Sequence, residues 1–284
     1  MSRPSNRLDE ARTLYARMMA AASGSADPRL ERIFELVPRE AFLPPGPWHV
    51  MVEHRLVETP SADPALLYQN ALVVLDRQKG INNGEPFLHA GWIGATAPGP
   101  GELVTQVGAG GGYYTAILSM LVLPGGKIVA YEIDATLAKA ARRNLAPFEN
   151  ASVVHKDAVT AKLPPSDIIY VNAGVVAPPL KWLKALKPGG RLVFPWRPAN
   201  SIGLAVLATR KPGGFAVRIL GGAWFIPCSG ASDEAITLKQ PSTKEAWQAR
   251  SIVLGAEREP DASAVAVYPD LWFSSQAVDQ ANAD

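Results

Sequence analysis

Glycines near the middle of the chain are the residues with the clearest chemical meaning. Residues 104–115 have the sequence V-T-Q-V-G-A-G-G-G-Y-Y-T, in which an apolar run ends at a glycine-rich loop and a second apolar run follows. Glycine permits a sharp turn and lets a ligand approach where a Cβ atom would clash. Ligands of open parallel sheets bind at the carboxyl ends of strands, so this loop is a candidate binding site.

The spacing of these glycines indicates which ligand the loop would bind. A dinucleotide-binding loop follows G-x-G-x-x-G, which would require glycine at position 113, where the chain has Tyr113. Gly108, Gly110 and Gly112 instead give G-x-G-x-G. This spacing favours S-adenosyl-L-methionine, which has no pyrophosphate to hold and leaves S-adenosyl-L-homocysteine as product. A glycine-rich turn without a ligand remains the alternative.

Polar residues follow three of the expected strands. Glu132 is expected to accept hydrogen bonds from the ribose hydroxyls, and Asp157 to reach the adenine amino group. Either acid could instead be a solvated residue at a strand end or turn. The full set of expected cofactor-binding residues is Gly108, Gly110, Gly112, Tyr113, Glu132, Asp157 and Asn172.

The elements around these residues predict the fold class. Strands are expected at 103–107, 127–131, 152–155, 167–171 and 191–194, and helices at 113–123, 135–145 and 178–186, with a helix stop at 187–190. Strands that alternate with helices predict an α/β fold, Rossmann-like and doubly wound, with a mostly parallel sheet.

The flanking segments are expected to add to this core. Helices are predicted at 7–22 and 28–36, a loop at 43–64, and a hairpin at the sheet edge from 202–209 and 215–220. Further on, we expect a helix at 243–254, a strand at 264–268 and a frayed stretch over the last ten residues. The chain then divides into N-terminal helices and loop (1–75), a cofactor-binding core (76–230) and a C-terminal extension (231–284).

Charge and composition indicate which classes of partner and which compartment to expect. The formal charge is only +2, with 28 basic and 26 acidic residues, which does not indicate a nucleic-acid partner. The first ten residues are polar and the longest apolar run is short, so neither a signal peptide nor a membrane span is expected. Cys228 is the only cysteine, which favours a reducing compartment and, with the rest, a cytoplasmic location. His49 and His54 lack further ligands nearby, so no metal is expected.

Several motifs resemble the protein-L-isoaspartate O-methyltransferases, a family of class I methyltransferases. Residues 37–44, V-P-R-E-A-F-L-P, resemble the family's V-P-R-E-x-F-V-P. Residues 82–90, N-N-G-E-P-F-L-H-A, lie where the family has T-I-S-x-P-x-x-x-A. Further motifs follow in the family's order: the glycine loop, Glu132, Asp157 and L-K-P-G-G at 186–190. W-F-I-P at 224–227 is similar to the family's closing strand. The resemblance covers about residues 8–230 and implies methyl transfer to a carboxylate of a peptide or protein.

The departures from the family pattern concern the acceptor side. Gln106 replaces an acid before the first glycine, Asn70 replaces an acid after the first loop, and Gly84 replaces a serine or threonine. Glu85 could repel a carboxylate, pair with a cationic acceptor or be a solvated loop acid. Asn70, Gly84 and Glu85 together predict weak or absent isoaspartyl repair.

The resemblance places the methyl acceptor beside residues 81–85. The residues expected to act on it are Asn82, Asn83, Gly84 and His89, with the N–H groups of Asn83 and Gly84 as donors. His89 could polarise the acceptor or be a hydrogen-bonded histidine of a helix. The other readings are methylation of a small metabolite or modified peptide, a non-catalytic S-adenosylmethionine-binding protein and, disfavoured by Tyr113, a dehydrogenase.

Overall fold

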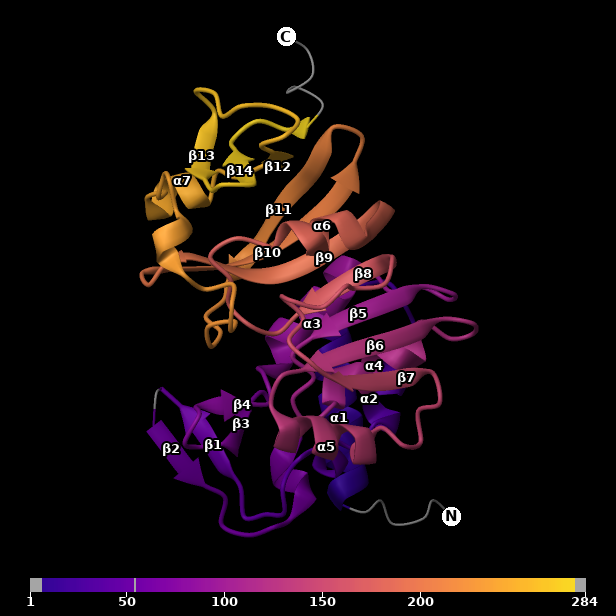
Figure 1. Ribbon diagram of the computed structural model, residues 1–284. Coiled ribbons are helices and arrows are strands. Elements are labelled where there is room, and N and C mark those ends of the chain that lie inside the picture. Colours follow the sequence, from indigo (N-terminus) through magenta and orange to yellow (C-terminus); the bar gives the residue numbers. More distant parts are fainter. Residues whose placement is uncertain (1–6, 54, 279–284) are drawn as a thin grey trace. The chain divides into compact units, whose positions relative to one another are not determined.

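The protein forms two compact units. A computed structural model describes residues 7–53 and 55–278 (Figure 1). The first unit holds the described residues up to 102 together with 109–155, and the second holds 103–108 and the chain from 156 onward. The chain therefore passes from the second unit to the first inside the glycine loop, between Gly108 and Ala109. The division into residues 1–75, 76–230 and 231–284 follows the order of the chain, whereas these units follow spatial contact. That division therefore stays a prediction.

Helices form a large part of the first unit. They are α1 (Arg7–Ser23), α2 (Arg29–Leu36), α3 (Pro86–Thr96), α4 (Tyr113–Leu121) and α5 (Ala135–Asn144), with short 3-10 helices η1 (Arg39–Phe42) and η2 (Pro64–Leu67). The first two confirm the predicted helices to within a residue. In α1 the buried residues Tyr15, Ala16 and Met19 recur at helical spacing, so one face of the helix lies against the core.

Strands of the first unit form two groups. Strands β6 (Lys127–Glu132) and β7 (Ala151–His155) pair in parallel, as predicted. A small sheet has the order β2-β1-β3-β4, made of β1 (His49–Val52), β2 (Arg55–Glu58), β3 (Leu72–Asp76) and β4 (Ile81–Asn82). The expectation of a loop over 43–64 was wrong, because β1 and β2 form an antiparallel hairpin. Its four-residue strands are too short to give a clear alternating pattern between the prolines.

Parallel strands open the second unit. Strand β8 (Ser166–Val171) lies between β5 (Leu103–Val107) and β9 (Leu186–Ala199), with α6 (Leu180–Ala185) before β9. The predicted α/β fold is confirmed. The predicted helix stop at 187–190 is instead part of β9, where the register with β8 slips and Gly189 adopts φ +74°. A bulge of this kind accommodates an extra turn of chain within a strand.

Antiparallel strands extend the second unit. They are β10 (Ile202–Lys211), β11 (Gly214–Gly222), β12 (Ser251–Leu254), β13 (Ala264–Val267) and β14 (Leu271–Ser274), in the order β9-β10-β11-β12-β14-β13. The predicted hairpin is present as β10 and β11. It does not lie at the edge, because β12, β14 and β13 follow it. The predicted strand at 264–268 is confirmed as β13.

Two further expectations in this unit were wrong. The helix expected at 243–254 is only one turn, α7 (Thr243–Ala246), because the capping box of Ser242 and Glu245 starts a helix that the buried strand β12 replaces. A further 3-10 turn, η3, spans Glu234–Ile236. The segment 224–227 is no strand and forms only a bridge from Pro227 to Gly174. Fraying was expected over the last ten residues. From residue 279 onward, these lie outside the described range.

Aromatic side chains build the core of the second unit. The rings of Trp196 in β9 and Phe273 in β14 stack 4.0 Å apart at 5°, and Trp182 is fully buried. The C-terminal extension therefore shares one core with the strands before it. Trp224, by contrast, is 65% exposed.

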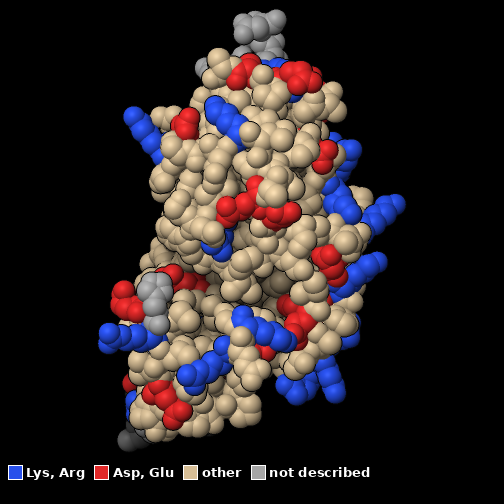
Figure 2. Space-filling view, turned by 60° about the vertical axis from the view of Figure 1, so that its left-hand side comes forward, with Lys and Arg blue, Asp and Glu red and all other residues tan. Residues whose placement is uncertain are grey.

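Figure 2 shows acidic and basic side chains interspersed over one face. Among the described residues, no helix is long and apolar enough to cross a membrane.

Candidate functional site

The glycine loop touches the N-terminal segment within the first unit. A Cβ atom on Gly111 would lie 2.2 Å from the carbonyl oxygen of Phe42. The ring of Phe42 also packs edge-on against Tyr113, 5.7 Å between centroids. Only glycine permits this backbone contact, which explains why the loop has a third adjacent glycine. The segment 37–44 therefore packs directly against the loop.

Glu132 holds the same loop from the end of β6. One carboxylate oxygen accepts a hydrogen bond from the N–H of Gly110 at 2.8 Å, and the other accepts one from the N–H of Asp134 at 3.0 Å. Burial raises the pKa of Glu132, and these two hydrogen bonds partly offset the rise. Each carboxylate oxygen has a further lone pair, so the group can still accept bonds from two hydroxyls. This donor-poor, acceptor-rich arrangement fits the ribose of S-adenosylmethionine.

Asn172 and Gly108 interact within the second unit. The side-chain amide of Asn172 donates to the carbonyl oxygen of Gly108 at 2.8 Å. Its other atom, Oδ1, is buried without a hydrogen-bond partner. Buried acceptors are nearly always satisfied, so an acceptor of this kind beside a glycine loop fits a donor group from a ligand. Asp157 accepts from the N–H of Val159 at 2.8 Å and keeps its second oxygen for another partner.

Tyr113 points into the core rather than toward the loop. It is 4% exposed, and its hydroxyl donates to that of Tyr15 at 3.3 Å. Burial raises the pKa of Tyr113 well above its ordinary value. These contacts favour a packing role for the side chain, and only the backbone of Tyr113 borders the loop.

The loop of residues 82–85 is closed by its own hydrogen bonds. Oδ1 of Asn82 accepts from the N–H of Gly84 at 2.9 Å, and the N–H of Asn83 donates to the carbonyl of Val73 at 2.9 Å. The expectation that these two N–H groups would be donors to the acceptor was therefore wrong. Oδ1 of Asn83 accepts from Val73, whereas its Nδ2 is buried without a partner.

His89 packs beneath this loop. It is 1% exposed, and its ring stacks on that of Tyr114 at 3.8 Å and 17°. Burial, together with the charge of Arg39, lowers the pKa of His89 to about 3. A buried, neutral, stacked ring favours the packing role over polarisation of an acceptor.

Sequence reasoning missed one contact of this region. Asn70 and Glu85 were considered separately, but Nδ2 of Asn70 donates to Glu85 at 2.8 Å. Glu85 is therefore not a solvated loop acid. No local pattern announces this pair, because it joins residues fifteen positions apart in the sequence through the packing of two segments.

Comparison with known proteins decides the family. The profile of the family described as Protein-L-isoaspartate(D-aspartate) O-methyltransferase matches residues 59–233. The protein-L-isoaspartate O-methyltransferase of Rhodopseudomonas palustris is 33% identical over 216 residues, which cover 74% of this chain and 89% of that protein. This chain belongs to that family. The protein-L-isoaspartate O-methyltransferase of Methylorubrum populi is 38% identical over 151 residues, which cover 52% of this chain and 70% of that protein.

Solved structures show that the methyltransferase also shares the family's fold. A protein-L-isoaspartate O-methyltransferase aligns over 95% of this chain and 90% of its own, with a TM-score of 0.67 and 21% identity. A beta-aspartate methyltransferase from Plasmodium falciparum, in complex with S-adenosyl-L-homocysteine, aligns over 79% of this chain and 99% of its own, with a TM-score of 0.60 and 17% identity. The family is one of S-adenosylmethionine-dependent enzymes.

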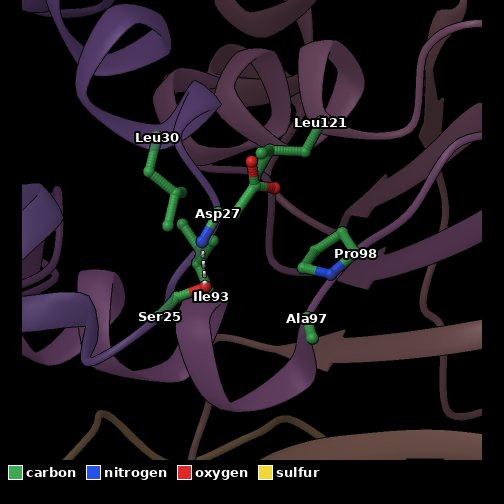
Figure 3. A pocket seen from close by; sticks show the side chains of 7 residues that line it. All are labelled: Ser25, Asp27, Leu30, Ile93, Ala97, Pro98 and Leu121. Carbon is green, nitrogen blue, oxygen red and sulfur yellow. Dashed lines mark hydrogen bonds between the residues drawn. The ribbon is translucent and has the colours of Figure 1, made fainter.

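Two further features of the methyltransferase are a cavity in the first unit and the buried thiol of Cys228 in the second. A cavity of about 190 Å³ in the first unit lies between the α1–α2 connection and the ends of α3 and α4 (Figure 3). It is lined by Ser25, Asp27, Leu30, Ile93, Ala97, Pro98 and Leu121, none of them in the expected site. Burial raises the pKa of Cys228 to about 12, so this thiol is not an activated nucleophile.

Within residues 7–53 and 55–278, no group of three or more His, Cys, Asp or Glu could hold an ion. His54, one of the two histidines considered, lies outside the described residues.

Proposed function

We propose that this chain methylates the carboxylate of isoaspartyl residues in peptides or proteins, with S-adenosylmethionine as donor. The observation that carries the proposal is the Glu132 carboxylate bonded to the glycine loop at 2.8 Å, in a chain of this family. Gly110, Gly112 and Glu132 would hold the cofactor. The assignment of Gly108, Asp157 and Asn172 to the same cofactor rests on their positions in the sequence.

The chemistry asks little of the side chains. S-adenosylmethionine supplies an electrophilic methyl group when it is bound. A carboxylate has a reference pKa of about 4 and is a nucleophile at pH 7, so no general base is required. The protein must bind the acceptor, orient its oxygen and exclude water, which can lower a barrier by several kcal/mol, up to roughly 7–11. Asn82, Asn83 and Gly84 would border the acceptor, with His89 supporting them from below.

The sequence predicts weak repair from three departures together, at Asn70, Gly84 and Glu85. Asn70 donates to the Glu85 carboxylate at 2.8 Å, which directs one of its oxygens toward residue 70. The family match supports isoaspartyl methylation, and we include it in the proposed function. A buried free cysteine is compatible with a reducing compartment, so we place the reaction in the cytoplasm.

The test is a methylation assay with a labelled methyl donor. An isoaspartyl peptide, its aspartyl counterpart of the same sequence and a set of small carboxylic acids serve as acceptors. We expect label in the isoaspartyl peptide alone, released as methanol by mild base as for a methyl ester. Label in the small acids alone would point to a metabolite as acceptor. Binding of S-adenosylhomocysteine without label in any acceptor would point to a non-catalytic binding protein.

A further inference from the structure

Asn70 caps a helix to which it does not belong. The N–H of Phe87, in the first turn of α3, donates to Oδ1 of Asn70 at 2.9 Å. The first N–H groups of a helix lack partners within the helix and are usually satisfied by the side chain at the N-cap. Here the N-cap is Glu85, whose side chain makes no such bond. Asn70 therefore takes over the capping role from a distant segment.

This cap fixes the orientation of the Asn70 amide. A backbone N–H can only donate, so the atom facing Phe87 must be the amide oxygen, and Nδ2 must point the other way. Nδ2 donates to Oε1 of Glu85 at 2.8 Å. Both side chains are half-buried. The amide thus joins the start of α3 to the carboxylate of the residue that closes the 82–85 loop.

A buried guanidinium holds Asn70 from behind. Arg39 is fully buried and donates to the carbonyl oxygens of Leu67, Gln69 at 2.9 Å and Ala71 at 2.6 Å. These carbonyls lie on both sides of Asn70 in the chain. The backbone at residue 70 is therefore fixed independently of its side chain, so a change of the Asn70 side chain would alter the loop rather than the segment that carries it.

We infer that Asn70 and Glu85 are a positioning pair that sets the conformation of the 82–85 loop, where the methyl acceptor would bind. The inference rests on the proposed function for the acceptor. The family pattern has an acid at position 70 and leaves position 85 open, whereas this chain has an amide at 70 and an acid at 85. The contact between Asn70 and Glu85 accounts for both departures. The pair still has one carboxylate, but it is at position 85 instead of position 70.

Reciprocal variants test the pair. Asn70→Asp places two carboxylates in contact, so we expect the KM for an isoaspartyl peptide to rise at least about tenfold. The affinity for S-adenosylhomocysteine, measured by calorimetry, should be unchanged. In the double variant Asn70→Asp with Glu85→Gln, the residue 70 carboxylate accepts from both Phe87 and the new amide. Its KM should return to within about threefold of the parent's. Gln69→Glu adds the same charge to the neighbouring exposed side chain and should leave KM unchanged.

Hydrogen exchange separates the pair from the identity of the acceptor. Exchange at the Phe87 N–H should accelerate at least about tenfold in Asn70→Asp and recover in the double variant, whatever the acceptor is. If the parent methylates no isoaspartyl peptide, the proposed function falls and this exchange measurement alone decides the pair. A double variant no better than Asn70→Asp in exchange would overturn the inference, as would an Asn70→Asp variant identical to the parent.

Discussion

The ring of His89 occupies the space that a side chain on Gly84 would need. A Cβ atom on Gly84 would lie 2.2 Å from Nε2 and 2.6 Å from Cδ2 of His89. Gly84 also has φ +79°, a backbone conformation that other residues rarely adopt. The glycine that replaces the family's serine or threonine and the histidine five residues later are therefore one steric unit.

Gly84→Ala is expected to destabilise the protein beyond the strain of its backbone. The positive φ alone costs roughly 1–2 kcal/mol for a residue with a Cβ atom. The clash with His89 adds to this, for a total of about 3 kcal/mol or more in urea denaturation. Gly24→Ala is the matched control, since Gly24 has φ +61° and no atom within 4 Å of its Cβ position. Equal losses for the two variants would show that the clash contributes nothing.

His89 should make the protein sensitive to mild acid. Its pKa is about 3 in the folded state, against an ordinary value of 6.5, so between these values the unfolded chain binds a proton that the folded chain does not. The contribution of His89 to the free energy of unfolding is therefore fully present above pH 6.5 and is lost progressively as the pH falls toward 3. From pH 7 to pH 5 the loss from this one group is about 2 kcal/mol.

Urea denaturation at both pH values measures this loss. His89→Gln should lose about 2 kcal/mol less than the parent between pH 7 and pH 5, whatever its stability at pH 7. His155→Gln, at an exposed position, should follow the parent. A His89→Gln variant with the parent's pH dependence would mean that other groups dominate the acid response.

Glu132→Gln should weaken cofactor binding almost as much as Glu132→Ala. Both carboxylate oxygens of Glu132 accept backbone N–H groups, and an amide would place its NH₂ against one of them. We expect the affinity for S-adenosylhomocysteine to fall by roughly 2–4 kcal/mol in calorimetry for either variant. Glu149→Gln, at an exposed position, is the control. Parent-like affinity of the Gln variant would remove Glu132 from the cofactor site.

Gly111→Ala should disturb the cofactor loop from its far side. The added methyl group would meet the carbonyl oxygen of Phe42 at 2.2 Å, so either the loop or the segment 37–44 must shift. We expect affinity for S-adenosylhomocysteine to fall at least about tenfold, since small displacements of a binding loop are costly. Gly99→Ala has only one contact, at 3.9 Å, and should bind as the parent does. Unchanged binding by Gly111→Ala would mean that the N-terminal segment does not shape this site.

Local patterns predicted the elements that carry strong periodic or glycine signals. The strand at 103–107 and the helix at 135–144 matched because apolar spacing and loop residues agree there. The hairpin at 49–58 was missed because its strands are only four residues long, have no fully buried residue and lie among prolines. The helix expected at 243–254 failed because a capping signal is local, whereas the pairing of Ile252 with Phe273 depends on distant chain.

The candidate site divided along the same line. Glu132 lies within hydrogen-bond distance of the glycine loop because parallel strands present their ends to such loops. The partners of Asn70 and His89, by contrast, come from segments brought together only by tertiary packing. Residue type could indicate that these positions had changed, but not that the changes compensate one another.

Strand β12 has a consequence for any attempt to trim the protein. The segment shared with the family ends at residue 233, yet β11 pairs on its outer side with β12, and Trp196 stacks on Phe273 beyond that point. A chain cut at 233 would leave β11 as an unprotected edge and expose an aromatic surface, a combination that promotes self-association. The segment that matches the family is therefore shorter than the segment that folds as a unit. Expressed alone, the family segment should aggregate.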